Sequence, residues 1–95
     1  LFPPSIALKR LYPTPFNAEL SIEYEVVDSR QASIRIFNLQ GKQVWTADVS
    51  SGITGSHTLK WNGRDQHQND LPSGLFIVQL SNQGFSQSQK VILLK

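Results

Sequence analysis

The stretch Leu20-Ser21-Ile22-Glu23-Tyr24-Glu25-Val26 decides the fold class of this chain. Apolar side chains stand at every second position, and serine or glutamate stands between them. A period of two is that of a β-strand, because successive side chains point to opposite faces of a sheet. One face of this strand is therefore predicted to be buried and the other to meet solvent. No segment shows the competing period of an amphipathic helix, so the chain is predicted to be all-β.

Similar short apolar patterns recur along the chain, separated by turn-forming residues about every 8–12 positions. Together they predict strands at 6–8, 20–26, 32–36, 42–49, 57–61, 75–78 and 85–94. Two sheets packed face to face bury such stripes, so we expect an immunoglobulin-like β-sandwich of about seven antiparallel strands in two sheets. Residues 1–17 are predicted to form a lead-in strand and a proline-rich turn, and residues 18–95 the sandwich.

Three glycines are predicted to shape the turns. Gly41 ends the predicted turn Asn38-Leu39-Gln40-Gly41, where it can take a positive φ in a hairpin. Gly63 ends one strand, and Gly74 restarts the chain after the polar connection 64–73. That connection contains a proline, which cannot donate to a central ladder, so we expect it to be exposed.

Some apolar residues do not follow strict alternation. Val44 and Trp45 are adjacent, which indicates a bulge or a strand covered on both sides. The run 75–78 is apolar on both faces and is predicted to be a central, well-protected strand. Large aromatic residues usually lie in the core, so Trp61 and Trp45 are predicted to pack between the sheets.

Composition narrows the function classes. With 95 residues the chain has room for one domain and little volume for a deep active-site cavity. Its formal net charge is only +2 and its cations are scattered, whereas a nucleic-acid surface needs clustered cations. No cysteine is present for a disulfide or a thiolate site, and no run approaches the ~18 apolar residues of a membrane helix. We therefore expect neither nucleic-acid binding nor membrane insertion.

No arrangement of titratable residues predicts catalysis. Glu23 and Glu25 lie about 7 Å apart on one strand face, where they point the same way instead of flanking a substrate. The loop 62–70 is rich in Asn and Asp but lacks the ligand spacing of a calcium-binding loop, so a turn-forming cluster is the favoured interpretation. We predict no catalytic residue, no metal site and no cofactor. Tyr12 and Phe37 are kept as candidate platforms on which a sugar ring could stack.

Several short motifs together resemble one family. In chain order they are Tyr12-Pro13-Thr14-Pro15-Phe16-Asn17, Ile34-Arg35-Ile36-Phe37-Asn38, Gly55-Ser56-His57, Trp61-Asn62-Gly63-Arg64-Asp65, Ser73-Gly74-Leu75-Phe76 and Lys90-Val91-Ile92-Leu93-Leu94-Lys95. Their order and spacing are similar to those of the type A C-terminal sorting domains of the type IX secretion system, which are related to the immunoglobulin-like part of the flagellar hook-capping protein. Thr14, Asn62 and the pair Asn69-Asp70 depart from the family pattern.

The resemblance implies a non-catalytic C-terminal address that carries a cargo from the periplasm through the outer membrane, for release or surface attachment. The partners it implies are the outer-membrane secretion machinery and an upstream cargo domain of the same polypeptide, with a hydrolase as the expected parent. The module itself is expected to be a monomer. Because the chain begins at Leu1 and contains no Met, we expect it to be one module of a longer polypeptide.

The closing segment is the predicted point of recognition. An edge strand with free backbone donors and acceptors can add to the sheet of a receptor. The residues predicted to do so are Lys90, Val91, Ile92, Leu93, Leu94 and Lys95. Two other functions stay open at this point, namely an accessory carbohydrate-binding module of a polysaccharide-degrading enzyme and a structural spacer.

Overall fold

The computed structural model describes residues 6–26, 32–49, 54–82 and 85–95. Within these ranges all regular secondary structure is β-strand, and no helix is present that could cross a lipid bilayer. In chain order the strands are β1 (Ile6–Tyr12), β2 (Leu20–Val26), β3 (Ala32–Phe37), β4 (Gln43–Asp48), β5 (Gly55–Trp61), β6 (Gly74–Asn82) and β7 (Phe85–Leu93).

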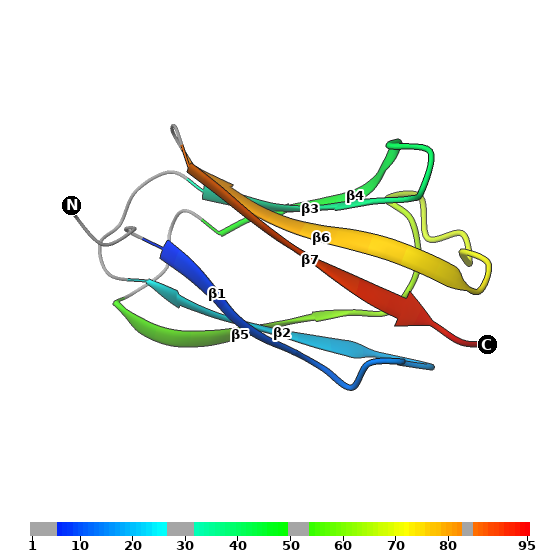
Figure 1. Ribbon diagram of the computed structural model, residues 1–95, viewed down its shortest axis with the longest axis horizontal. Helices are drawn as coiled ribbons and strands as arrows, with labels where there is room; N and C mark the ends of the chain where they lie inside the picture. The colour runs from blue at the N-terminus through cyan, green and yellow to red at the C-terminus, as the bar shows by residue number, and fades with distance from the viewer. Residues whose placement is uncertain (1–5, 27–31, 50–53, 83–84) are drawn as a thin grey trace.

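The strands form two layers (Figure 1). One sheet has the order β1-β2-β5 and the other the order β4-β3-β6-β7, and all neighbouring strands are antiparallel. The predicted all-β sandwich of seven antiparallel strands in two sheets is confirmed. Its core lies between the layers, because the alternating apolar residues of β2 and β3 point inward, as do Phe76, Val78 and Leu80 of β6.

Strand β1 corrects the predicted boundary at residue 8. It continues to Tyr12, because a bulge between Leu8 and Arg10 shifts its register on β2. The bulge changes which residues point inward, so that Ile6 and Leu11, which are five positions apart, are both 3% exposed. A strict period of two cannot connect these two residues, which is why the sequence pattern predicted only three residues of this strand.

The predicted bulge in β4 is confirmed. Trp45 pairs with Ile36 and Gln43 pairs with Phe37, so Val44 is the extra residue between them. The bulge places Trp45 at the margin of the core, where it is half-buried and its ring centroid lies 6.5 Å from that of Trp61. Trp61 itself is 1% exposed, as predicted for a core residue.

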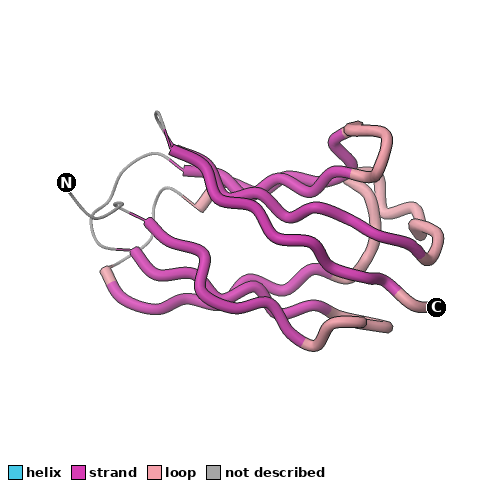
Figure 2. Tube along the Cα trace, viewed as in Figure 1, coloured by secondary structure: helices cyan, strands magenta, loops and turns pink. Residues whose placement is uncertain are grey.

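One end of the sandwich gathers three connections and the end of the chain (Figure 2). The connections are 13–19, 38–42 and 62–73, and residues 94–95 lie beside them. We call this the C-terminal end of the sandwich. The aromatic rings of Phe16 and Phe76 pack against Trp61 here, with centroid distances of 5.5 and 5.7 Å. This end of the core is therefore filled by aromatic side chains.

Candidate functional site: the closing segment

Strand β7 is an edge strand, but its last residues are not a free edge. On one side β7 pairs with β6. On the other side, the Phe16 N–H donates to the Ile92 carbonyl and the Leu94 N–H donates to the Phe16 carbonyl, both at 2.8 Å. The expectation that free backbone groups run along the whole closing segment is therefore corrected for residues 92–94, because the turn after β1 already covers them.

Side chains in the closing segment divide between the core and the surface. Val91 is 1% exposed and Leu93 is 0% exposed, so these two close the core. Ile92 and Leu94 point away from it and are 41% and 51% exposed. These two are therefore the apolar side chains of the segment that a partner could contact.

Gly63 packs against the buried half of the segment. Its φ is +74°, a conformation that L side chains rarely adopt. A Cβ atom at this position would lie 3.5 Å from both methyl groups of Leu93 and 3.6 Å from the ring of Phe16. Gly41 also has a positive φ, +83°, whereas Gly74 is the first residue of β6 and does not.

Polar groups from two loops hold the residues that follow β7. The Asn17 side-chain amide donates to the Leu94 carbonyl at 2.9 Å, and the Lys95 N–H donates to Ser73 Oγ at 2.8 Å. Lys95 Nζ also lies 3.3 Å from Asp70 Oδ1. We call Phe16, Asn17, Asp70 and Ser73 the clasp. Through these contacts the end of the chain is fixed against the sandwich.

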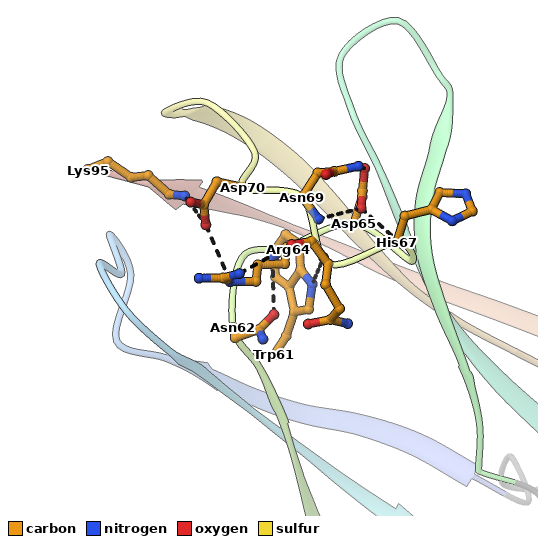
Figure 3. A network of polar contacts seen from close by, with 9 residues as sticks. Trp61, Asn62, Arg64, Asp65, His67, Asn69, Asp70 and Lys95 are labelled. Atoms are coloured by element: carbon orange, nitrogen blue, oxygen red, sulfur yellow. Dashed lines mark hydrogen bonds and ion pairs between the residues drawn. The ribbon is translucent and has the colours of Figure 1, made fainter.

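The loop that supplies Asp70 is ordered by its own side chains (Figure 3). Arg64 Nε lies 3.3 Å from Asp70 Oδ1, and Arg64 Nη1 donates to the Gln68 carbonyl at 3.2 Å. The Trp61 ring N–H donates to the Arg64 carbonyl at 2.9 Å. This bond links the loop to the aromatic core. Asp70 therefore receives both Arg64 and Lys95, and the loop and the closing segment share one carboxylate.

Asp65 organises the other half of the same loop. Its Oδ1 accepts hydrogen bonds from the backbone N–H groups of His67 and Asn69, both at 2.9 Å. These bonds favour the ionised carboxylate, and they hold the pKa of Asp65 below its ordinary value, with the bond from Asn69 as the largest cause. The Asn62 side chain accepts from Arg64 N–H in the same manner. This confirms the predicted turn-forming cluster, and the described residues offer no group of three metal ligands.

The charged residues of β1 and β2 form surface ion pairs. Lys9 lies 3.5 Å from Glu25, and Arg10 lies 3.4 Å from Glu23, on the outer face of the three-stranded sheet. The His57 ring stacks on Tyr24, with the two ring centroids 5.5 Å apart. Burial raises the pKa of Tyr24. The glutamates and the histidine do not converge on one site.

The two candidate sugar platforms lie on different sheets. Tyr12 ends β1, where the Arg10 guanidinium lies 4.2 Å from its ring centroid and its hydroxyl donates to Glu23 at 2.9 Å. Phe37 ends β3 in the other sheet and faces outward opposite Ile77. Both rings are half-buried. The structure does not bring them together into one platform.

The clasp residues Asn17, Asp70 and Ser73 were not singled out as site residues from the sequence. Asn17 is 77 positions from its partner Leu94, and Ser73 is 22 positions from Lys95. The one signal that could have found Asn17 and Ser73 is that each belongs to a motif quoted above. Four of these motifs, which contain Phe16, Gly63, Ser73 and the closing segment, meet at the C-terminal end of the sandwich (Figure 1).

Comparison with known proteins matches this chain to a family and to solved structures. The family described as "Secretion system C-terminal sorting domain" matches residues 10–94. Among solved structures, dimeric latent PorU from Porphyromonas gingivalis has a TM-score of 0.74 at 15% identity, and PorZ has a TM-score of 0.64 at 18% identity. PorZ is described as an essential surface component of the type-IX secretion system of the same bacterium.

The similarity to these two structures concerns one part of each. It covers 94% of this chain and 9% of PorU, and 90% of this chain and 11% of PorZ. At such identities the likeness shows the fold. A search of the curated proteins found no match.

Proposed function

We propose that this chain, which belongs to the secretion system C-terminal sorting domains, is recognised by the export machinery through its closing segment 90–95. A domain of this family directs a cargo protein through the outer membrane by the type IX secretion system, and that is the function of this module. The sorting domain itself is a non-catalytic module. Its surface therefore has to provide recognition and not chemistry.

The observation that carries the proposal is the way the clasp holds the closing segment. Phe16, Asn17 and Ser73 bind the backbone of residues 92–95, while Val91 and Leu93 are anchored in the core. Ile92 and Leu94 are thereby presented at fixed positions on the surface. A receptor that binds a segment already held in its bound shape loses less conformational entropy than one that must order a free tail.

The backbone available for strand addition lies earlier in β7. Residues of an antiparallel edge strand turn their backbone groups alternately toward the neighbour and toward the open side. The backbone carbonyl of Ile92 meets Phe16 on the open side, so the backbone groups of Lys90 and Ser88 point to that side too. Among the described residues, no backbone hydrogen bond is formed to them there. Recognition in this proposal therefore combines the outward side chains of Ile92 and Leu94 with the open edge at 86–90.

The rest of the parent protein belongs to the same proposal. The cargo is an upstream domain of the same polypeptide, a hydrolase in our expectation, and any catalysis resides there. The module passes through the periplasm as a monomer and delivers the cargo to the cell surface or the medium. Support for a larger parent comes from the similar structures, of which this chain spans about a tenth.

Deleting residues 90–95 would be a poor test, because it removes Val91 and Leu93 from the core. A sharper test changes only the outward side chains. The 95-residue chain is fused to a periplasmic reporter in a bacterium with a type IX secretion system, and the double variant Ile92→Asp/Leu94→Asp is compared with the unchanged chain. Leu39→Asp is the control, because Leu39 is another exposed apolar residue, 64% exposed, and lies in the β3–β4 turn outside the closing segment and the open edge.

The expected result is a reporter outside the cell for the unchanged chain and for Leu39→Asp, and a folded reporter retained in the periplasm for the double variant. Resistance to added protease shows that the retained module is folded. Normal export of the double variant would contradict the role of the closing segment, and failure of the unchanged chain to be exported would contradict the function as a whole.

A further inference from the structure

The outer face of the four-stranded sheet carries an apolar area beside the closing segment. Because Phe76, Val78, Val91 and Leu93 point into the core, the residues between them point outward. Cross-strand register then places Phe37 opposite Ile77, Ile77 opposite Lys90, and Leu75 opposite Ile92. We call Arg35, Phe37, Leu75, Ile77, Lys90 and Ile92 the outer patch.

The apolar character is confined to one half of this face. Toward the other end of the same strands, the outward positions in matching registers are Ser33, Gln79, Ser81 and Ser88. That polar half is what an antiparallel sheet shows toward solvent. The apolar half departs from this polar pattern. It lies at the C-terminal end of the sandwich (Figure 1), where the chain also exposes Leu94.

The charges on the two outer faces also differ. On the three-stranded sheet the cations are matched, since Lys9 pairs with Glu25, Arg10 with Glu23, and Lys60 with Glu19. On the outer patch, Arg35 and Lys90 are exposed and have no ion-pair partner among the residues that the structure describes. Unmatched cations beside apolar side chains favour a partner surface that is apolar and bordered by carboxylates.

We propose that the outer patch is a docking surface for a protein of the secretion machinery whose own surface is apolar and acidic. Lys90 and Ile92 belong both to the patch and to the closing segment, so the two surfaces are continuous. The inference rests on the proposed function, and it extends recognition from the end of β7 onto β6 and β3. The recognised feature is then a folded surface of three strands and not a linear tail.

Two variants test the outer patch without changing the closing segment's apolar residues. Ile77→Asp places a charge at the centre of the patch. Arg35→Gln/Lys90→Gln removes its two cations and leaves the apolar contacts of the fold unchanged. The matched control for this double variant is Lys9→Gln/Lys60→Gln, which removes two cations from the opposite face, where each of them forms a surface ion pair that contributes little to stability.

Each variant is fused to the periplasmic reporter, and the exported fraction is measured beside protease resistance of the module. We expect Ile77→Asp and Arg35→Gln/Lys90→Gln to lower export about tenfold or more, and Lys9→Gln/Lys60→Gln to be exported as the unchanged chain is. Export of a protease-resistant Ile77→Asp fusion and of Arg35→Gln/Lys90→Gln at unchanged levels would overturn the patch. If Ile92→Asp/Leu94→Asp still blocked export in that case, the proposed function would stand without it.

Experiments with the purified unchanged fusion test two other occupants of the patch. A dimer in sedimentation that is lost in Ile77→Asp would assign the patch to a second copy of this chain and overturn the proposal. Retention on insoluble polysaccharide that is lost in Phe37→Ala would assign it to a glycan and overturn it likewise. A monomer without retention, together with the export defects, supports docking on the secretion machinery.

Discussion

Gly63 is the residue on which the buried half of the closing segment depends. A Cβ at this position would make only ordinary contacts, at 3.5 Å to Leu93, so the strain of an alanine comes from φ +74° and not from a clash. A left-handed conformation costs a residue with a side chain about 1–2 kcal/mol. Gly63→Ala is therefore expected to lower the free energy of unfolding by about that amount, measured by urea denaturation.

Gly41 supplies the comparison for this prediction. Its φ is +83° and open space surrounds the position where a Cβ would stand. Gly41→Ala should lose a similar free energy, but a leucine should separate the two sites, because only at Gly63 do Leu93 and Phe16 block a longer side chain. Equal stabilities of Gly63→Leu and Gly41→Leu would contradict the close packing of Leu93 against residue 63.

At the scale of elements, the clasp joins loops to the end of β7 through single hydrogen bonds. Ser73→Ala removes the acceptor for the Lys95 N–H. A bond of this kind contributes about 0.5–1.5 kcal/mol, and its loss should be felt locally at the chain end. Hydrogen exchange should accelerate at Leu94 and Lys95 and remain unchanged at Val78, which lies in the core.

Ser88→Ala is the control for the clasp, because Ser88 is exposed on β7 and no clasp bond involves it. It should leave exchange at the chain end unchanged. Faster exchange at Val78 in Ser73→Ala would mean that the whole sandwich, and not the clasp alone, had been loosened.

The loop 62–73 is predicted to be sensitive to acid through Asp65. Its pKa is lowered from 3.8 in the folded state, so the folded chain binds fewer protons than the unfolded chain around that pH. The stabilisation from Asp65 is therefore fully present above pH 3.8 and is lost as the pH falls through the lowered pKa. The difference in melting temperature between the unchanged chain and Asp65→Ala should be present at pH 7 and shrink below pH 3.8.

Asp65→Asn separates charge from hydrogen bonding in this prediction. An asparagine keeps an oxygen for the N–H groups of His67 and Asn69 but has no carboxylate to protonate. Its melting temperature relative to that of Asp65→Ala should not change over the same pH range. If the difference in melting temperature from Asp65→Ala shrank equally for the unchanged chain and for Asp65→Asn, the titrating group would be a residue other than Asp65.

For the whole molecule, the architecture could be predicted from period-two patterns, and the site only in part. The alternation at 20–26 and 32–36 reports burial directly, and these strands were predicted within one residue of their ends. Strand β1 was underestimated because its bulge interrupts the period. The clasp was out of reach, since nothing local in Asn17 indicates a bond to a residue 77 positions away.

Apart from the open stretch 86–90 of β7, contacts or charges on the sheet edges discourage pairing between copies of the molecule. Leu8 N–H on β1 donates to the Gln87 side chain, and Phe16 covers the end of β7. On β4, the Gln66 N–H donates to the Val44 carbonyl, and the Gln66 side chain accepts from Thr46 N–H at 2.9 Å. Strand β5 carries the exposed Lys60, and a charge on an edge strand also discourages pairing.

At Thr46 the cover on β4 depends on a single side chain, so Gln66→Ala should expose the Thr46 N–H as a donor for another chain. We expect a loss of about 0.5–1.5 kcal/mol in stability and concentration-dependent self-association in analytical ultracentrifugation. Gln40→Ala is the control, because Gln40 is exposed in the β3–β4 turn and its side chain makes no edge contact in the described structure. If Gln66→Ala stays monomeric at every concentration where Gln40→Ala does, the backbone bond from Gln66 to Val44 is sufficient to protect this edge.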